Sequence, residues 1–293
     1  MASTHSLLRR IKTAQNISKT TKAMQMIAAS KLKRAQDSAL SSRSYVEKLL
    51  EVTGNVTKHM ETSLLPVYMK PAKKDGKTLY IVISPDKGLC GGLITNTLKE
   101  VIQRANAHDS FVTIGKKVEL PVSRISRNLE ASFLFGTTLP QYDVVYPIAK
   151  IIDEQFLSGK VDSVAIISSH FVNLFSQKPH VTELLPIKPI EQQGQETKDK
   201  MQTTKPVNKF QLFEPVVEEI LPDLLRRYME MTLFQEMLES YLAEQAARLL
   251  SMQNATNNAR DIIEDLKLEY NKTRQAKITS EILDITGASV TAN

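Results

Sequence analysis

The sequence predicts a mixed α/β protein, with a long antiparallel coiled coil of the N- and C-terminal helices beside a central Rossmann-like α/β domain. Three observations support this prediction. Apolar residues recur every three or four positions in both terminal segments, the intervening segment alternates strand and helix patterns, and proline-rich or polar stretches separate the parts. The expected divisions are residues 1–62 for the first coiled-coil helix, 77–208 for the α/β domain and 214–287 for the second helix, which pairs with the first.

The terminal helices are predicted from seams of apolar residues at 3.5-residue spacing, one over residues 7–60 and one over 224–283. Their polar interruptions are Thr21, Ser42, Gln245, Thr273 and Ser280. A heptad repeat of this length is typical of a left-handed coiled coil rather than of helices that pack around a globular core. We therefore expect a rod that projects from the central domain.

The central domain is predicted from short apolar runs that alternate with amphipathic segments. Strands are expected at residues 78–84, 111–115, 129–136 and 161–169, and helices at 93–107 and 142–158. Residues 181–189 end at prolines, which favours an edge strand, with the preceding strand as its candidate hairpin partner. The polar stretch 191–208 is expected to be a mobile loop.

The charge of the chain is unevenly distributed. The net charge is +6. Residues 1–36 contain Lys and Arg but no Asp or Glu. In residues 214–244, by contrast, acidic residues outnumber Arg226 and Arg227. A basic patch can bind nucleic acid, but the first segment has no aromatic residue to stack on bases, so an acidic protein surface fits at least as well.

Composition excludes several classes of protein. No run of 18 apolar residues is present, which argues against a transmembrane span. The first residues lack a signal-peptide core and favour a mature cytoplasmic start over a transit peptide. The single cysteine, Cys90, excludes an intramolecular disulfide and fits a reducing compartment.

No motif in the sequence amounts to an active site, so we expect no catalytic residue, no cofactor and no metal ion. The turn at residues 84–92 lies where many α/β proteins bind phosphate, but it matches neither of the nucleotide-binding motifs G-x-x-x-x-G-K-[ST] and G-x-G-x-x-G. Its glycines are better explained by a tight turn and close packing. Cys90 has no identifiable base beside it. The five histidines lack ligand spacing, and the helical carboxylates are interpreted as solvated ion-pair faces.

Two segments of the rod, residues 20–31 and 270–281, have apolar groups away from the seam. A helix pair alone would leave these groups in water. We therefore expect this end of the rod to be enclosed on several sides.

Five stretches resemble the gamma-subunit family of rotary F-type ATP synthases: ISKTTKAMQMIAASKLKRAQ, ISPDKGLCGGL, LLRRY, EQAARLLSMQNAT and YNKTRQAKITSEILDITGA. The resemblance covers essentially the whole chain. It implies a non-catalytic central rotor shaft, whose coiled coil lies within a ring of three alpha and three beta subunits. The resemblance also implies partners below the ring, namely epsilon, delta and the c-subunit ring, through which proton flow is coupled to ATP synthesis or hydrolysis.

The resemblance also assigns contact residues. It implies contacts with beta for Arg274, Gln275, Thr279 and Glu281. Met24 and Arg248 match positions that affect the coupling efficiency. Asp86, Lys87 and Cys90, in the turn at residues 84–92 (the head turn), match a turn that lies near a loop of beta. Contacts with the c ring are implied for Gln211, Leu212, Phe213 and Glu214. The charge pattern adds a hypothesis that Lys22, Lys31, Lys33 and Arg34 form a basic collar that faces acidic segments of beta. The cysteine-bearing insertion of the chloroplast type is absent, so no thiol switch is expected.

Two alternatives stay open from the residues alone. A coiled-coil tether with a basic end could bind nucleic acid, a membrane or another acidic surface, and an enzyme could be built around Cys90. A pull-down read by mass distinguishes the rotor, which brings ring subunits in fixed proportion, from a tether, which gives homodimers. The expected location is the cytoplasmic side of a bacterial inner membrane, as a peripheral protein, with a processed organelle protein as the alternative.

Overall fold

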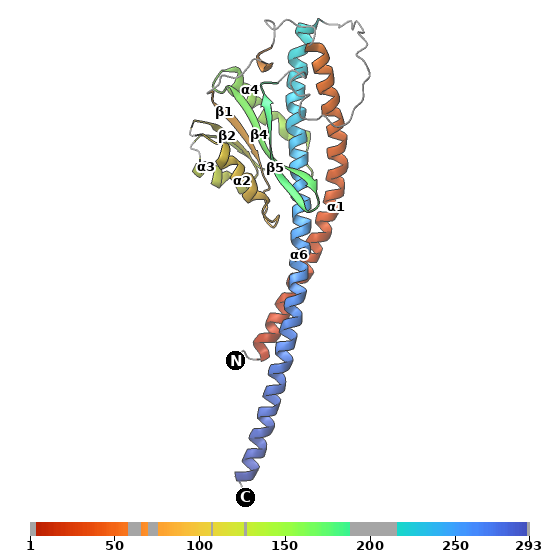
Figure 1. Cartoon of the computed structure of the whole chain (residues 1–293), viewed down its shortest axis with the longest axis vertical. Coiled ribbons are helices and arrows are strands. Elements are labelled where there is room, and N and C mark those ends of the chain that lie inside the picture. The colour runs from red at the N-terminus through yellow and green to blue at the C-terminus, as the bar shows by residue number, and fades with distance from the viewer. Residues whose placement is uncertain are drawn as a thin grey trace. The chain divides into compact units, whose positions relative to one another are not determined.

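The structure is a computed structural model that describes residues 4–57, 66–69, 76–106, 108–125, 128–187 and 216–291, without the side chains of Thr57, Glu218 and residues 284–291. It contains two compact units, Met1–Ser30 with Arg248–Asn293 (unit 1) and Lys31–Ala247 (unit 2). Helices α1 (Thr4–Thr57) and α6 (Val217–Thr291) each contribute residues to both units (Figure 1). The boundary between the units lies inside both helices, so it does not test the predicted division at residues 62, 77, 208 and 214. That division stays a prediction.

Unit 2 contains a five-stranded sheet in the order β3-β2-β1-β4-β5. The strands are β1 (Thr78–Ile83), β2 (Ser110–Ile114), β3 (Leu129–Phe133), β4 (Ser163–Asn173) and β5 (Ser176–Leu185). Neighbours are parallel except β4 and β5, which form an antiparallel hairpin with β5 at the edge. The mixed α/β class is therefore confirmed. The predicted edge strand and its hairpin partner are also present, but β5 begins at Ser176 rather than at residue 181 and ends at Leu185 rather than at residue 189.

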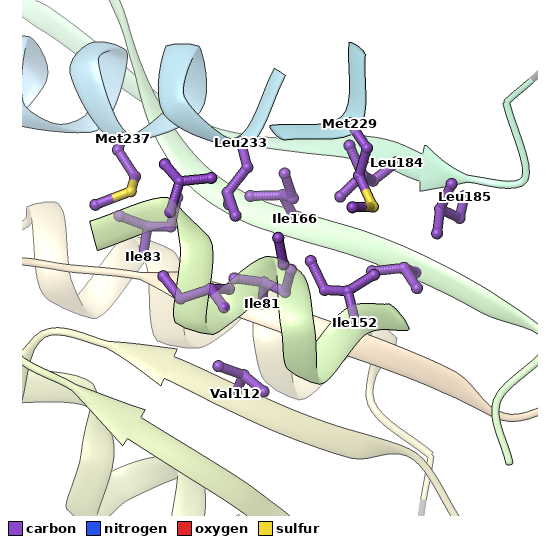
Figure 2. Packing of buried hydrophobic residues seen from close by; sticks show 14 of the residues in the cluster. Ile81, Ile83, Val112, Ile152, Ile166, Leu184, Leu185, Met229, Leu233 and Met237 are labelled. Atoms are coloured by element: carbon purple, nitrogen blue, oxygen red, sulfur yellow. The ribbon is translucent and has the colours of Figure 1, made fainter. Parts of the chain in front are cut away.

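Helices cover both faces of the sheet, as expected for a Rossmann-like arrangement. The helices are α2 (Leu93–Arg104), α3 (Lys116–Ile125) and α4 (Val145–Leu157), with short 3₁₀ turns at η2 (Val67–Met69) and η3 (Tyr142–Val144). Alternation along β1 sends Ile81 and Ile83 into the core shared with α4 and α6, and Val82 into the core shared with α2 and α3. Figure 2 shows the first of these cores, where side chains of α6 point toward the strands.

Helix α3 was not predicted, because Pro121 lies inside it. Proline removes one helical hydrogen bond and is read as a helix breaker. Here Val118 and Val122, one helical turn apart, are both fully buried against the sheet, and this packing outweighs the lost bond. Packing against the sheet therefore makes this segment helical, although its local sequence pattern does not predict a helix.

The middle of α6 belongs to the globular core of unit 2. Met229, Leu233 and Met237 are fully buried in the cluster that contains the sheet residues (Figure 2). Ala35 and Ala39 of α1 belong to the same cluster. The prediction that the periodic segments exclude packing around a globular core is wrong for this part of α6. A seam at 3.5-residue spacing predicts that the face of α6 toward α1 is buried, but it does not show whether the opposite face is buried as well.

The two helical segments of unit 1 pack in antiparallel directions. Thr256 donates a hydrogen bond to Thr21 over 2.8 Å, and further along the pair Ser6 and Leu266 line one groove. Residue numbers therefore rise on α1 while they fall on α6. Leu7, the first apolar seam residue described, is fully buried.

The seam predictions hold with two exceptions. On α1, Ile17, Met24 and Val52 are exposed by 51%, 37% and 49%. On α6, the predicted pairing is wrong beyond Thr273, because residues 274–283 are all exposed. Ser6 and Leu266 line the same groove, and of α1 only Thr4 and His5 are described before Ser6. The described part of α1 is therefore too short to cover residues 274–283.

Some predicted features lie outside the described residues. These are the polar loop 191–208, most of the chain from 58 to 75 and the ends of the chain. Among the helices that the structure describes, none is both long and apolar enough to cross a membrane.

Candidate interaction surfaces

Unit 1 presents apolar side chains to solvent along both of its helical segments. Its large exposed residues are Leu8, Ile17, Met24, Met26, Ile27, Ile262, Leu268, Ile278, Ile282 and Leu283. Met26 and Ile27 are successive residues, about 100° apart around a helix, and are 61% and 56% exposed. Apolar exposure in more than one direction agrees with the expectation of an enclosed rod end and marks an interaction surface.

A groove of about 600 Å³ runs between the two segments of unit 1. Its floor contains Ala14 and Ala259, which are nearly buried, and its walls include Ile17 and Ile262. Small side chains at the contact let the two helix backbones approach, and the larger apolar neighbours are left at the rim. The guanidinium groups of Arg9 and Arg10 add positive charge to the α1 side of the groove.

The predicted contact residues near the C-terminus form an exposed polar face on one helical segment. Arg274, Gln275, Thr279 and Glu281 are all exposed. The Thr279 hydroxyl donates to the Gln275 carbonyl over 2.9 Å, and Glu281 lies 3.6 Å from the Lys277 ammonium. Because solvent screens this pair, its own contribution to stability is at most about 1 kcal/mol.

The predicted coupling residues Met24 and Arg248 both belong to unit 1. Met24 is 37% exposed, and Arg248 is half-buried. Neither residue is part of the groove lining.

The basic residues of the predicted collar have different surroundings. Lys22 donates to the Gln25 side chain over 3.3 Å, whereas the Lys31 ammonium donates to the backbone carbonyl of Thr137. Lys33 forms an exposed pair with Asp37 at 3.4 Å, and Arg34 is exposed. Lys31 therefore has a local structural role in unit 2 in addition to any role toward a partner.

Asp86, in the head turn, holds three backbone segments together. Its carboxylate accepts hydrogen bonds from the N–H groups of Lys116 (2.8 Å), Phe135 (3.3 Å) and Gly136 (2.7 Å). Lys116 is the first residue of α3, so the carboxylate also lies at the positive end of that helix. Asp86 thereby fixes the shape of the turn that the exposed Lys87 and Leu89 present to solvent.

Cys90 is buried, with 1% of its surface exposed. It packs with Leu93 and with Ala243 and Ala247 of α6. The reading of Cys90 as a structural thiol agrees with this burial, and its assignment to a contact with beta stays a prediction. Within the turn, Leu89 and Gly91 have positive φ, which agrees with the predicted tight turn, but a Cβ at Gly88 would meet nothing within 4 Å, so that glycine serves no close packing.

The predicted contacts with the c ring cannot be placed, since Gln211, Leu212, Phe213 and Glu214 lie outside the described residues.

The interpretation of the helical carboxylates as solvated faces is wrong for four glutamates in the middle of α6, although it holds for exposed ones such as Glu264, Glu269 and Glu281. Glu230, Glu236, Glu239 and Glu244 are between 3% and 7% exposed. Glu239 pairs with Arg43 of α1, while Glu230 accepts a hydrogen bond from the Tyr142 hydroxyl over 2.6 Å. Burial, followed by this hydrogen bond and the negative charge of Glu230, raises the pKa of Tyr142 well above its usual value.

Two of the five histidines lie together. His170 of β4 and His180 of β5 stack with ring centroids 4.2 Å apart, beside Glu236. This pairing leaves no local pattern in the sequence because it depends on the hairpin register. Among the described residues, no group of His, Cys, Asp or Glu has an arrangement that could hold a metal ion.

Comparisons with known proteins agree along the whole chain. The sequence profile of the family described as ATP synthase matches residues 3–290. An ATP synthase gamma chain of Dehalococcoides mccartyi strain BAV1 is 36% identical over 293 residues, which cover 99% of each chain. An ATP synthase gamma chain of Roseiflexus castenholzii is 37% identical over 303 residues, which cover 100% of this chain and 99% of the relative.

Solved structures have the same fold. A chain in the central stalk and c-ring structure of the Tetrahymena thermophila mitochondrial ATP synthase aligns with a TM-score of 0.58 at 27% identity, over 80% of this chain and 99% of that chain. A chain of the Euglena gracilis mitochondrial ATP synthase aligns with a TM-score of 0.57 at 18% identity, over 92% and 94%. At 18% identity the second similarity concerns the fold alone.

Proposed function

Since the chain belongs to the family of ATP synthase gamma chains, we propose that it is the non-catalytic central rotor shaft of an F-type ATP synthase. The observation that carries the proposal is the match over the whole length, which includes both terminal helices and the α/β domain. The central-stalk structure of Tetrahymena thermophila has the same fold at 27% identity. The tether and the Cys90 enzyme are not favoured, because neither accounts for this match.

In the proposed assembly, unit 1 lies within a ring of three alpha and three beta subunits. The exposed apolar residues around both of its helical segments, such as Met26, Ile27 and Ile278, support a partner that surrounds them. Unit 2 binds epsilon and the c ring, with residues 211–214 as the c-ring contact, and delta belongs to the same catalytic sector. No nucleic-acid partner is proposed.

The mechanism is coupling through differential contact. The faces of unit 1 differ chemically at the level of the groove. The apolar groove with Arg9 and Arg10 lies on one face, and Lys12, Gln15 and Asn16 of the same helical segment are exposed away from it. A shaft with identical faces would contact every catalytic subunit equally and could not change their relative affinities. Rotation of an asymmetric shaft presents each beta subunit with each face in turn, so the affinities for ADP, phosphate and ATP change in sequence.

The residues proposed to contact beta are Met24, Lys31, Lys33, Arg34, Asp86, Lys87, Cys90, Arg248, Arg274, Gln275, Thr279 and Glu281. Proton movement through the membrane sector drives the rotation in synthesis, and ATP hydrolysis reverses it. The proposed location is the cytoplasmic face of a bacterial inner membrane, as a peripheral subunit.

The composition of the complex tests the function. Tagged full-length chain, isolated from its native membranes and read by mass, is expected to bring alpha and beta subunits in equal numbers, together with epsilon, delta and c subunits. Recovery of homodimers without ring subunits would support the tether and reject the rotor.

The exposed pair Lys277 and Glu281 tests the contact face, because the chain contains a matched pair elsewhere. Lys150 and Glu154 of α4 have the same four-residue spacing and are also exposed, with atoms 3.9 Å apart. In the assembled complex, Lys277→Ala with Glu281→Ala is expected to lower proton-driven ATP synthesis by roughly tenfold, which corresponds to about 1.4 kcal/mol. Lys150→Ala with Glu154→Ala should leave synthesis unchanged, and equal effects of the two double variants would reject the contact face.

A further inference from the structure

One buried carboxylate of α6 adds polar contacts to the apolar packing between this helix and the β4–β5 hairpin. Both oxygens of Glu236 accept hydrogen bonds: Ser168 donates over 2.6 Å and His170 lies at 2.8 Å on one oxygen, and Thr182 donates over 2.8 Å to the other. Glu236 is 6% exposed. A carboxylate at this depth is stabilised only while these partners remain in place.

The donors come from both strands of the hairpin. In the antiparallel register Ser168 lies opposite His180, and Ile166 lies opposite Thr182. Successive residues on a strand alternate faces, so Ser168, His170, His180 and Thr182 share the face toward α6. Because β5 is the edge strand, its strand pairing is with β4 alone. The Glu236 network therefore adds polar contacts to the apolar packing of Leu184 and Leu185, which also holds β5 in unit 2.

The two histidines respond to protons in opposite directions. Burial alone would lower the pKa of His170, but the hydrogen bond and negative charge of Glu236 outweigh it and raise the pKa above its usual value. Burial, and then the positive charge of His170, lower the pKa of His180. A proton on both rings would place two like charges with their ring centroids 4.2 Å apart.

Charged groups from five elements act on this cluster. They are Glu236 and Glu239 of α6, Arg43 of α1, Arg104 of α2, and the histidines of β4 and β5. Glu239 favours the charged form of His170, and Arg43 opposes it. Glu236 itself is desolvated, yet its pKa stays below the usual value because His170, Ser168 and Thr182 stabilise the carboxylate.

We propose that Glu236, His170 and His180 form a pH-dependent latch that holds the β4–β5 hairpin on α6 near neutral pH and loosens it toward both acid and alkali. In the closed latch, His170 is protonated and positively charged, and His180 is neutral. It concerns unit 2 alone and does not depend on the proposed rotor function.

The sign of each effect follows from the direction of the pKa. The contribution of His170, whose pKa is raised, is fully present below pH 6.5 and is lost as pH rises through its folded value. The contribution of His180, whose pKa is lowered, is present above pH 6.5 and is lost as pH falls toward its folded value. Glu236 adds a further loss only below pH 4.5.

Hydrogen exchange of the full-length chain between pH 5 and 9, corrected for intrinsic rates, tests the latch. Opening of the β4–β5 amides relative to β1 is expected to be smallest near neutral pH and to rise by roughly tenfold for each pH unit by which a histidine pKa is displaced. His180→Gln should remove the rise toward acid, and His170→Gln the rise toward alkali.

His108→Gln is the matched control, because His108 is exposed and lies in the same unit. It should leave the pH dependence as in the unaltered chain. The latch is rejected if all three variants share one pH profile. Should a variant fail to fold, proton NMR titration of the unaltered chain decides instead: values for His170 above 6.5 and for His180 below 6.5 support the latch, and overlapping titrations reject it.

Discussion

At the scale of single residues, the backbone leaving β1 and the backbone leaving β2 approach so closely that only glycine fits between them. Gly115 has φ of +112°, and a Cβ at this position would lie 1.8 Å from the carbonyl oxygen of Ser84. The Gly115 N–H donates to Phe133 over 2.7 Å, and the Ser84 N–H donates to Ile114 over 2.8 Å. These bonds fix both segments, so neither can withdraw to admit a side chain.

Gly115→Ala is therefore expected to destabilise the chain severely, by about 4 kcal/mol or more, since backbone strain and a clash with backbone coincide. Gly159→Ala separates the two causes: its φ is +70° with open space around it, so it should cost only about 1 kcal/mol. Gly88→Ala has neither problem and should change stability by less than about 0.5 kcal/mol. Urea unfolding of the three variants measures this order, and equal losses at Gly115 and Gly159 would contradict the clash.

At the scale of elements, α6 is attached to its neighbours in unit 2 by buried glutamates as well as by apolar packing. Glu239 contacts Arg43 of α1, Glu236 contacts the hairpin, and Glu230 contacts Tyr142 of η3. The hydrophobic effect is non-directional, whereas a buried carboxylate is stable only beside its donors. The glutamates therefore fix the register of α6 against three different elements.

Arg43→Ala tests this idea on α1. It leaves Glu239, which is 3% exposed, with the hydrogen bond from the Gln235 side chain over 3.2 Å, and should lower the free energy of unfolding by about 3 kcal/mol. Adding Glu239→Gln removes the stranded charge and should restore part of the loss. Thermal unfolding checks both variants.

Lys48→Ala is the control for Arg43→Ala, because Lys48 forms an exposed ion pair with Glu51 on the same helix. Its effect should be far smaller than that of Arg43→Ala, because solvent screens an exposed pair. A double variant no more stable than Arg43→Ala alone would show that Arg43 acts through packing rather than through charge.

At the scale of the whole molecule, the two units differ in how much apolar surface they bury. Unit 2 contains a continuous core of sheet and helix side chains, whereas the buried apolar residues in the described part of unit 1 are few, and half of them are alanines. They are Leu7, Ile11, Ala14, Ala28, Met252 and Ala259. Burying a large apolar side chain contributes about 1.5–3 kcal/mol, so unit 1 has less to hold it together.

Hydrogen exchange of the isolated chain is therefore expected to be faster in residues 4–30 and 248–283 than in residues 31–57 and 221–247. Opening free energies in the first set should be lower by about 2 kcal/mol or more. Assembly with the ring subunits should slow exchange mainly in unit 1, because the exposed apolar residues there become covered. Uniform protection along both helices, before and after assembly, would contradict this expectation.

The sequence predicted the elements whose apolar pattern is strong. The run from Thr78 to Ile83 and the seam residues Leu7, Ala28 and Ala35 are where the pattern placed them, because periodicity reports directly which face is buried. It did not predict α3, where burial of Val118 and Val122 outweighs Pro121.

The sequence also could not predict the polar contacts of the head. The Glu236 network depends on the register of a hairpin, and Asp86 bonds to backbone groups from two distant segments. Such contacts are set by tertiary geometry and leave no local pattern. The contact residues assigned by family resemblance are exposed for the most part, and their partners remain predictions.

The burial of Cys90 has a practical consequence. Its sulfur is shielded by α6, so thiol reagents that act on the folded chain should react far faster with a cysteine introduced at an exposed position, such as Lys150 or Lys277. A dye or bead can then be fixed at one chosen point without first deleting the natural thiol. Movement could thus be followed in a chain that differs from the natural one by a single residue.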